Sequence, residues 1–202
     1  MKENFKLGII LAIITSIAGV LLGLANGVTK DAIAENSKLN KEDLALIMPL
    51  ATSVEETDKK LEGNILEVLE GKNGSEGVGY LFKVNTKGFH GPVDLMIAIS
   101  NEGKMTGLKV ISHSETPGLG AKIDEEKFTS RFKDVPIDKG ISMVKTSPAS
   151  EGEVEGVTGA TISSKAVGTA VNEAINYYRV NIQGDAPIEE NGTDANSGAS
   201  ES

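Results

Sequence analysis

The sequence predicts an α+β fold, in which an antiparallel sheet meander is packed with helices behind one N-terminal transmembrane helix. Three observations lead to this expectation. An uncharged apolar run opens the chain, alternating apolar and polar residues fill its middle, and a helical apolar pattern follows a glycine-bearing loop near residue 160. One face of a half-buried sheet must be covered by a helix or another sheet, and the helical pattern can supply that cover.

Residues 7–25 contain no charged side chain, and about 20 such residues span a bilayer as a helix. Lys2 and Lys6 precede the run, and the basic residues after it lie farther away, which favours a cytoplasmic N-terminus and an extracytoplasmic remainder. A cleaved signal peptide is the alternative, but the run exceeds the roughly 7–15 apolar residues of a signal core. We therefore expect residues 1–26 to be a retained anchor in the cytoplasmic membrane.

Residues 27–50 are expected to form a polar stalk that ends in a short helix. Asn40 can cap this helix, and Pro49 can stop it. Residues 51–64 are expected to be a loop and a short charged helix, and residues 71–77 form a turn cluster rich in Gly, Asn and Ser.

The middle of the chain alternates with period two over residues 78–84 and 93–99, which predicts two half-buried strands. A turn at residues 101–104 leads into a third strand over residues 105–111, so the strands should form an antiparallel meander.

Helical signals dominate the rest of the chain. A helix is expected over residues 121–133, where Phe128 and Phe132 are spaced by one turn. A short strand follows at residues 141–144, and the last helix should run from the glycine-bearing loop to about Asn181. Residues 184–202 are polar and acidic with almost no apolar side chain, and are expected to be disordered.

The composition excludes several classes of partner and site. A net charge of −9 argues against a nucleic-acid partner, which normally needs a basic face. The chain has no Cys, which excludes disulfides, thiolate metal sites and iron–sulfur clusters, and its two His are too few to build a zinc site. We therefore expect no metal site, and any redox chemistry would need an organic cofactor.

The glycine-bearing loop reads E-G-V-T-G-A-T-I-S-S-K from Glu155 to Lys165. Its end lies at a helix N-terminus, where up to four backbone N–H groups lack an intrahelical partner. Ser163 or Ser164 can cap one or two of these groups, and an ordinary capped helix is the simplest interpretation. The first turn carries no acidic residue, however, and Lys165 opposes the helix dipole, so the arrangement favours a bound anion such as a phosphate.

A second compact loop reads E-T-P-G-L-G from Glu115 to Gly120. Taken alone, it is a connector between a strand and a helix, Glu115 is a solvated or turn-bonding carboxylate, and His113 is a surface histidine.

Together, T-G-A-T-I-S-S at residues 158–164 and E-T-P-G-L-G at residues 115–120 resemble the two motifs of the FMN-binding domain family. The resemblance implies that Thr161 carries FMN through a phosphoester bond. The family usually has Asp six residues before this Thr, and the present chain has Glu155 there. The other residues that the resemblance assigns to cofactor binding are Thr158, Gly159, Ala160, Ser163, Ser164, Glu115, Thr116, Pro117, Gly118, Leu119 and Gly120.

Over residues 1–182 the chain resembles the G subunit of the Rnf electron-transport complex. The resemblance implies a membrane-anchored flavoprotein, with its FMN-binding domain at residues 51–183, in a ferredoxin:NAD oxidoreductase that moves Na⁺ or H⁺. It also implies that the partners are the other Rnf subunits and a flavin transferase. Thr161 would anchor the cofactor, with no catalytic acid or base, and apolar residues near Phe82, Leu95 and Leu119 would line the isoalloxazine.

Three alternatives stay open at this point. The C subunit of the Na⁺-translocating NADH:quinone reductase belongs to a sister family that shares both motifs, although it is usually longer. An anchored binding module could use the same glycine loops for a small anionic ligand without redox work. A purely structural protein of the complex could retain the motif without its cofactor.

Overall fold

The computed structural model describes residues 2–36 and 39–188. The chain divides into an N-terminal helical unit and a second compact unit that begins at Asn40. Most of the tail that we expect to be disordered, residues 184–202, lies outside the described residues.

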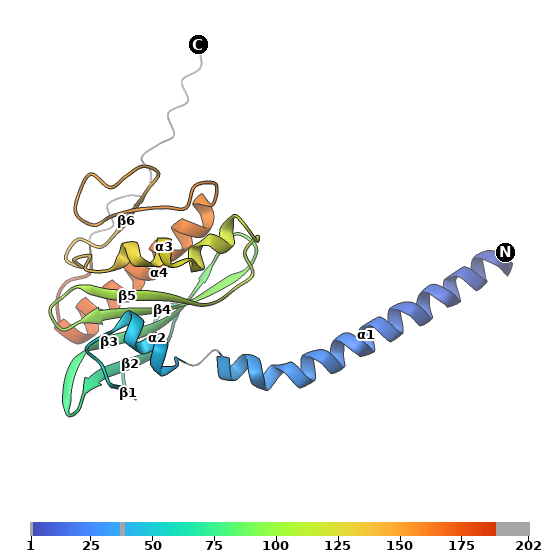
Figure 1. Ribbon diagram of the computed structural model, residues 1–202, viewed down its shortest axis with the longest axis horizontal. Coiled ribbons are helices and arrows are strands. Elements are labelled where there is room, and N and C mark those ends of the chain that lie inside the picture. The colour runs from blue at the N-terminus through green and yellow to red at the C-terminus, as the bar shows by residue number, and fades with distance from the viewer. Residues whose placement is uncertain (1, 37–38, 189–202) are drawn as a thin grey trace, which may run out of the picture. The chain divides into compact units, whose positions relative to one another are not determined.

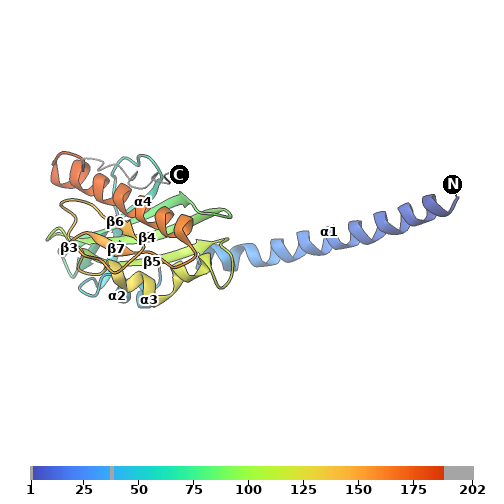
Figure 2. The ribbon, with the colours of Figure 1, turned by 90° about the horizontal axis from the view of Figure 1, so that it is seen from above.

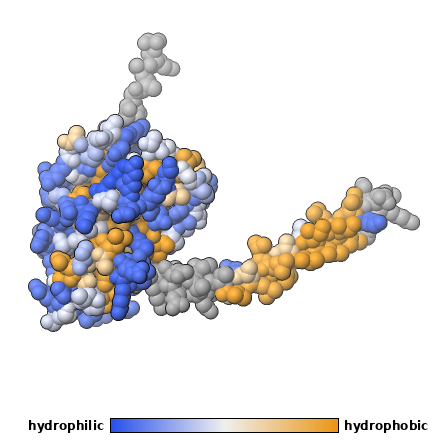
Figure 3. Space-filling model, viewed as in Figure 1, coloured by the Kyte–Doolittle hydropathy of each residue, from blue (hydrophilic) through white to orange (hydrophobic). Residues whose placement is uncertain are grey.

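The N-terminal unit is the helix α1, Lys2–Asn36. Its segment Lys6–Val28 is long and apolar enough to cross a membrane, a test that a signal sequence also passes. Apolar side chains line the face of this segment that Figure 3 shows, and those of Leu7, Leu11 and Leu22 are well exposed. The helix also continues beyond the predicted anchor, into the first part of the predicted stalk.

The second unit is built on a five-stranded antiparallel sheet in which the strands follow one another in chain order (Figure 1). The three predicted strands are present and slightly longer than expected. The five strands are β1 (Ser53–Glu56), β2 (Ile65–Asn73), β3 (Glu76–Lys87), β4 (Pro92–Ser100) and β5 (Met105–His113).

The prediction of a short charged helix within residues 51–64 is wrong, because β1 lies there. The strand β2 was also missed. Of the predicted turn cluster at residues 71–77, only residues 74 and 75 form the turn, because β2 ends at Asn73 and β3 begins at Glu76. The register of β2 against β3 shifts twice, between Ile65 and Glu67 and between Gly71 and Lys72. Each irregularity moves the apolar side chains to the other face, so β2 has no period-two pattern.

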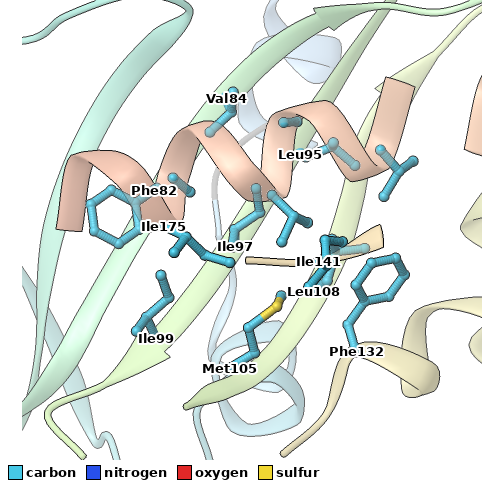
Figure 4. Packing of buried hydrophobic residues seen from close by; sticks show 14 of the residues in the cluster. Phe82, Val84, Leu95, Ile97, Ile99, Met105, Leu108, Phe132, Ile141 and Ile175 are labelled. Atoms are coloured by element: carbon cyan, nitrogen blue, oxygen red, sulfur yellow. The ribbon is translucent and has the colours of Figure 1, made fainter. Parts of the chain in front are cut away.

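The main core lies between the sheet and the helix α4, Thr161–Tyr177, as Figure 4 shows. Ala170 and Ala174 of α4 are fully buried, and their small side chains let the helix lie close to β3 and β4. Phe82 and Leu95 are 0 % exposed within this core. The expectation that these two residues line a flavin is therefore wrong, because no surface of theirs can reach a ligand.

The opposite face of the sheet is covered by the short helix α2, Lys41–Ile47 (Figure 2). The predicted cap is confirmed, since the Asn40 side chain accepts the backbone N–H of Asp43 at 2.7 Å. Gly107 of β5 lets α2 approach closely, because a Cβ there would lie only 2.6 Å from the Cα of Ile47. The two faces are thus covered by elements from opposite ends of the unit.

The expected helix over residues 121–133 is broken into three pieces. A 3-10 turn (Gly120–Asp124), the helix α3 (Glu126–Thr129) and a second 3-10 turn (Ser130–Phe132) follow one another. Glu125 separates the first two with an extended backbone conformation. The predicted aromatic pair is confirmed, because the rings of Phe128 and Phe132 meet edge to face at 5.3 Å.

The predicted strand at residues 141–144 is confirmed as β6, Ser142–Val144. It pairs in parallel with β7, Glu153–Glu155, which was not predicted. The last helix continues from α4 through a π-helical segment, Tyr178–Gln183, and ends at Gly184, where φ is +78°. This agrees with the predicted end near Asn181.

Candidate functional site

Hydrogen bonds from other segments of the chain fix the loop between β7 and α4. The Arg131 side chain donates to the backbone carbonyl of Glu155 at 2.6 Å, and its guanidinium also lies 3.7 Å from the Glu155 carboxylate. Gly156 donates its N–H to the carbonyl of Val144, which extends the pairing of β6 with β7 by one residue. Gly159 has a φ of +81°, a conformation that favours glycine. The loop therefore brings the chain to Thr161 along a defined path.

The first turn of α4 has no side-chain cap. Ser164 accepts the N–H of Val157 in the loop, and Ser163 donates to Glu115, so the prediction that either serine caps the helix is wrong. Within the described residues, the backbone N–H groups of Thr161, Ile162 and Ser163 have no acceptor. Three unpaired donors at the positive end of a 17-residue helix form a site suited to an anion.

The four hydroxyl groups of the motif have different environments. Ser163 and Ser164 are buried, and each is engaged in a hydrogen bond within the protein. Thr158 and Thr161 are exposed. Of the two, only Thr161 belongs to the uncapped first turn, so its hydroxyl is the one placed next to the three unpaired donors.

A cavity of about 170 Å³ opens beside Thr161. Two lysines, Lys145 and Lys165, contribute to its wall, and both are exposed. Their positive charge adds to that of the helix terminus. The remaining lining residues are Met143, Val144, Gly156, Val157, Thr158, Gly159, Thr161 and Ser164.

The loop at residues 115–120 lies against the same turn of α4 but does not line this cavity. The Leu119 side chain is near Gly159, where an added Cβ would lie 3.5 Å from it. Thr116 shares a 3.0 Å hydrogen bond with His90, while Pro117 and Gly118 are exposed. The two sequence motifs are therefore brought together in space, and Ala160, the residue just before α4, is buried.

Glu115 is buried, with 5 % of its surface exposed, rather than solvated. One carboxylate oxygen accepts the N–H groups of Phe89 and His90 at 2.7 and 3.1 Å, and the other accepts the Ser163 hydroxyl at 2.5 Å. Burial opposes ionisation, but the hydrogen bonds from Ser163 and from the two backbone N–H groups outweigh it. The pKa of Glu115 therefore lies below its ordinary value.

This lowered pKa predicts a pH-dependent contribution to stability. A carboxyl whose pKa is lower in the folded state stabilises the protein above its unfolded pKa, and the contribution is lost as the pH falls through the folded value. We expect wild type to be more stable than Glu115→Gln at pH 7, with the difference shrinking below pH ~4. Denaturant unfolding of both proteins between pH 3 and 7 measures this, and a difference that widens in acid would contradict it.

Three large apolar side chains are exposed on segments that are linked to the first turn of α4. They belong to Phe89 (60 %), Leu119 (51 %) and Ile162 (53 %), and come from three separate segments. Phe89 packs edge to face on His90 at 4.7 Å. Sequence reasoning did not assign Phe89, Ile162 or Lys145 to the site. The available signal in the sequence was Gly-Phe-His-Gly at residues 88–91. The structure explains its first glycine, because a Cβ at Gly88 would collide with the Glu115 carboxylate.

Residues 88–176 match the model of the FMN-binding domain family. The chain is 34 % identical over 197 residues to the G subunit of the Na⁺-translocating ferredoxin:NAD⁺ oxidoreductase complex of Acetobacterium woodii, in an alignment that covers 88 % of this chain and 93 % of the relative. It is also 34 % identical to the G subunit of an ion-translocating oxidoreductase complex of Methanosarcina acetivorans, over 87 % of this chain and 95 % of the relative.

The fold is also found in a solved structure. The C subunit of the Na⁺-translocating NADH-quinone reductase from Parabacteroides distasonis superposes with a TM-score of 0.58 at 21 % identity, covering 75 % of this chain and 94 % of that one. At this identity the likeness shows the shared fold. The extensive similarity to G subunits shows the family: this chain belongs to the G subunits of the ion-translocating ferredoxin:NAD⁺ oxidoreductase complexes.

Proposed function

We propose that this protein is a membrane-anchored subunit that carries FMN covalently on Thr161 and relays electrons within an ion-translocating ferredoxin:NAD⁺ oxidoreductase complex. The names of its relatives support the complex, and the FMN-binding domain match supports the cofactor. The observation that carries the attachment is the exposed Thr161 hydroxyl on a helix turn with three unpaired N–H donors.

The residues around Thr161 fit a phosphate. Backbone N–H groups at a helix N-terminus bind phosphate oxygens directly, and the helix dipole favours the negative charge. Lys145 and Lys165 can balance the rest of the charge from the cavity wall. The cavity of about 170 Å³ accommodates the phosphate end of the cofactor, and the ring would extend beyond it.

The attachment step requires an activated donor. The Thr161 oxygen forms a new bond to phosphorus while its hydroxyl proton leaves, so another bond to phosphorus must break. Condensation with free FMN would expel water and is unfavourable in water, whereas a flavin dinucleotide can release a nucleoside monophosphate. No carboxylate or histidine lines the described cavity. We therefore assign both the donor and the base to a separate flavin transferase.

Phe89, Leu119 and Ile162 are the residues that we propose for contact with the isoalloxazine. They are large, apolar and exposed, unlike Phe82 and Leu95. FMN, when bound, supplies one- and two-electron chemistry. The protein's own residues hold the phosphate, orient the ring and leave one side of it open to neighbouring subunits, so no catalytic acid or base is needed.

In-gel fluorescence tests this proposal. The full chain, expressed with a flavin transferase, should give a fluorescent band after denaturation in SDS, and the mass of the tryptic peptide that ends at Lys165 should increase by one FMN minus water. A binding module for a small anion would use the same uncapped turn and the same lysines without a covalent group. A colourless, unmodified chain under these conditions would favour that second candidate.

The absence of Cys makes the orientation directly testable. We propose that the N-terminus is cytoplasmic and that the FMN-binding domain is extracytoplasmic. Ser75→Cys, in the exposed hairpin between β2 and β3, should react with a membrane-impermeant maleimide in intact cells. Asn4→Cys should react only after the membrane is permeabilised. The reverse pattern would invert the topology.

A further inference from the structure

We propose that Glu115 is a positioning residue that fixes residues 88–91 against the first turn of α4 and so holds Phe89 ready for the flavin ring. The inference rests on the proposed function, because it concerns how the protein receives FMN at Thr161. It differs from the role that the sequence motif suggests for Glu115, which is direct contact with the cofactor.

The Glu115 carboxylate joins three segments that are far apart in the sequence. It accepts from the backbone of Phe89 and His90, which lie 26 and 25 residues earlier. It also accepts from Ser163, which lies 48 residues later and two residues beyond Thr161. One carboxylate therefore sets the position of the residues 88–91 loop relative to the attachment site.

The surrounding backbone is shaped to admit this carboxylate. A Cβ on Gly88 would lie 2.3 Å from one of its oxygens, and a Cβ on Gly120 would lie 2.6 Å from the other. The backbone N–H of Glu115 in turn donates to the His113 ring at 3.2 Å. Any larger residue at either glycine would displace the carboxylate.

Every hydrogen bond that the structure shows for the Glu115 carboxylate is made with a group of the protein. Both oxygens are occupied by donors of the protein, and the side chain is almost fully buried. A carboxylate is purely an acceptor, so it suits two N–H groups and a hydroxyl at once, whereas a glutamine amide would bring its own N–H donors to one of these partners. Glu115 thus acts through the groups that it holds, not by touching a ligand.

Stability alone does not explain where these hydrogen bonds are placed. A buried carboxylate loses its hydration, and hydrogen bonds from the protein must first offset that loss before they stabilise the fold. Here they order a loop whose largest side chain, Phe89, remains 60 % exposed and adds little to the core. What the carboxylate fixes is the position of the segment that carries this exposed aromatic ring relative to the first turn of α4, and such a ring can stack on an aromatic cofactor.

The test compares Glu115→Gln with Glu173→Gln in the full chain. Glu173 is a matched control, because it also accepts a backbone N–H, that of Asn64, but does so near the far end of α4. In the flavin-free proteins, amide hydrogen exchange at Phe89 and His90 should be ~10-fold or more faster in Glu115→Gln and unchanged in Glu173→Gln. The initial rate of flavin transfer to Thr161 should fall ~10-fold in Glu115→Gln only.

A spectroscopic readout separates positioning from general destabilisation. Flavin attached to Glu115→Gln should show higher fluorescence and lower anisotropy than in wild type, because the ring is less well held, whereas Glu173→Gln should match wild type. Wild-type exchange at Phe89 and His90 in Glu115→Gln, or wild-type transfer and fluorescence, would overturn the inference.

The inference can still be tested if Glu115→Gln does not fold or if wild type accepts no flavin. If Glu115→Gln does not fold, Ser163→Ala is the second variant. It keeps the carboxylate but removes the hydrogen bond that links it to α4. Flavin transfer at the wild-type rate in Ser163→Ala would overturn the inference. If wild type itself accepts no flavin, the proposed function fails, while the exchange rates of Phe89 and His90 still decide whether Glu115 holds the loop.

Discussion

Thr161→Val is expected to abolish covalent flavin attachment completely. Valine has nearly the same shape as threonine and is tolerated at a helix N-terminus, so the fold and the three unpaired N–H groups of the turn should persist. Only the oxygen that would bond to phosphorus is removed. The variant, expressed with a flavin transferase, should therefore show no fluorescent band in SDS and no mass increase in the tryptic peptide that ends at Lys165.

Thr158→Val is the matched control for this experiment. Thr158 is also exposed and also lines the cavity, but it precedes the helix. We expect this variant to keep its covalent flavin, with at most a reduced rate of attachment. Flavin that survives denaturation on Thr161→Val, or that is lost only from Thr158→Val, would place the bond on another hydroxyl.

Phe82→Ala is expected to destabilise the protein by about 3–5 kcal/mol. The Phe82 side chain is fully buried, and its ring meets those of Tyr177 and Tyr178 at 5.7 and 6.4 Å. Removing it leaves a cavity between β3 and the end of α4 that the surrounding side chains can fill only in part. Denaturant unfolding of the full chain in detergent, monitored by circular dichroism, measures the change.

Phe89→Ala provides the comparison, because it is the same substitution at an exposed position. Its unfolding free energy should stay within about 0.5 kcal/mol of wild type, while the fluorescence of the attached flavin should change. Similar losses of stability in both variants would mean that Phe89 belongs to the core. A normal flavin spectrum in Phe89→Ala would remove this ring from the proposed cofactor surface.

Much of the fold could be predicted because its signals are local. The apolar run of α1, the alternation in β3 to β5, the Asn40 cap and the start of α4 are each contained in one short segment. The strand β2 could not be predicted, since its two register shifts are set by its partner β3. The break at Glu125 is also set by the way the flanking pieces pack on β5.

The sequence shows the two motifs but not the contacts that their residues make. Hydrogen bonds between distant segments decide the partner of each hydroxyl and carboxylate. Ser163 would cap an isolated helix, but here it donates to a residue 48 positions earlier. Phe82 and Leu95 were assigned to the cofactor by their apolar character, which does not distinguish a core face from an exposed one.

The helix α4 both covers the core and begins with Thr161, the residue that we propose for attachment. A polypeptide that stops before residue 160 therefore lacks the cover of this face of the sheet and, on our proposal, the hydroxyl that receives the flavin. Maturation would then follow a fixed order, in which α4 is made and packed on the sheet before a transferase can act on Thr161. A yellow colour of the protein would report that this helix is in place.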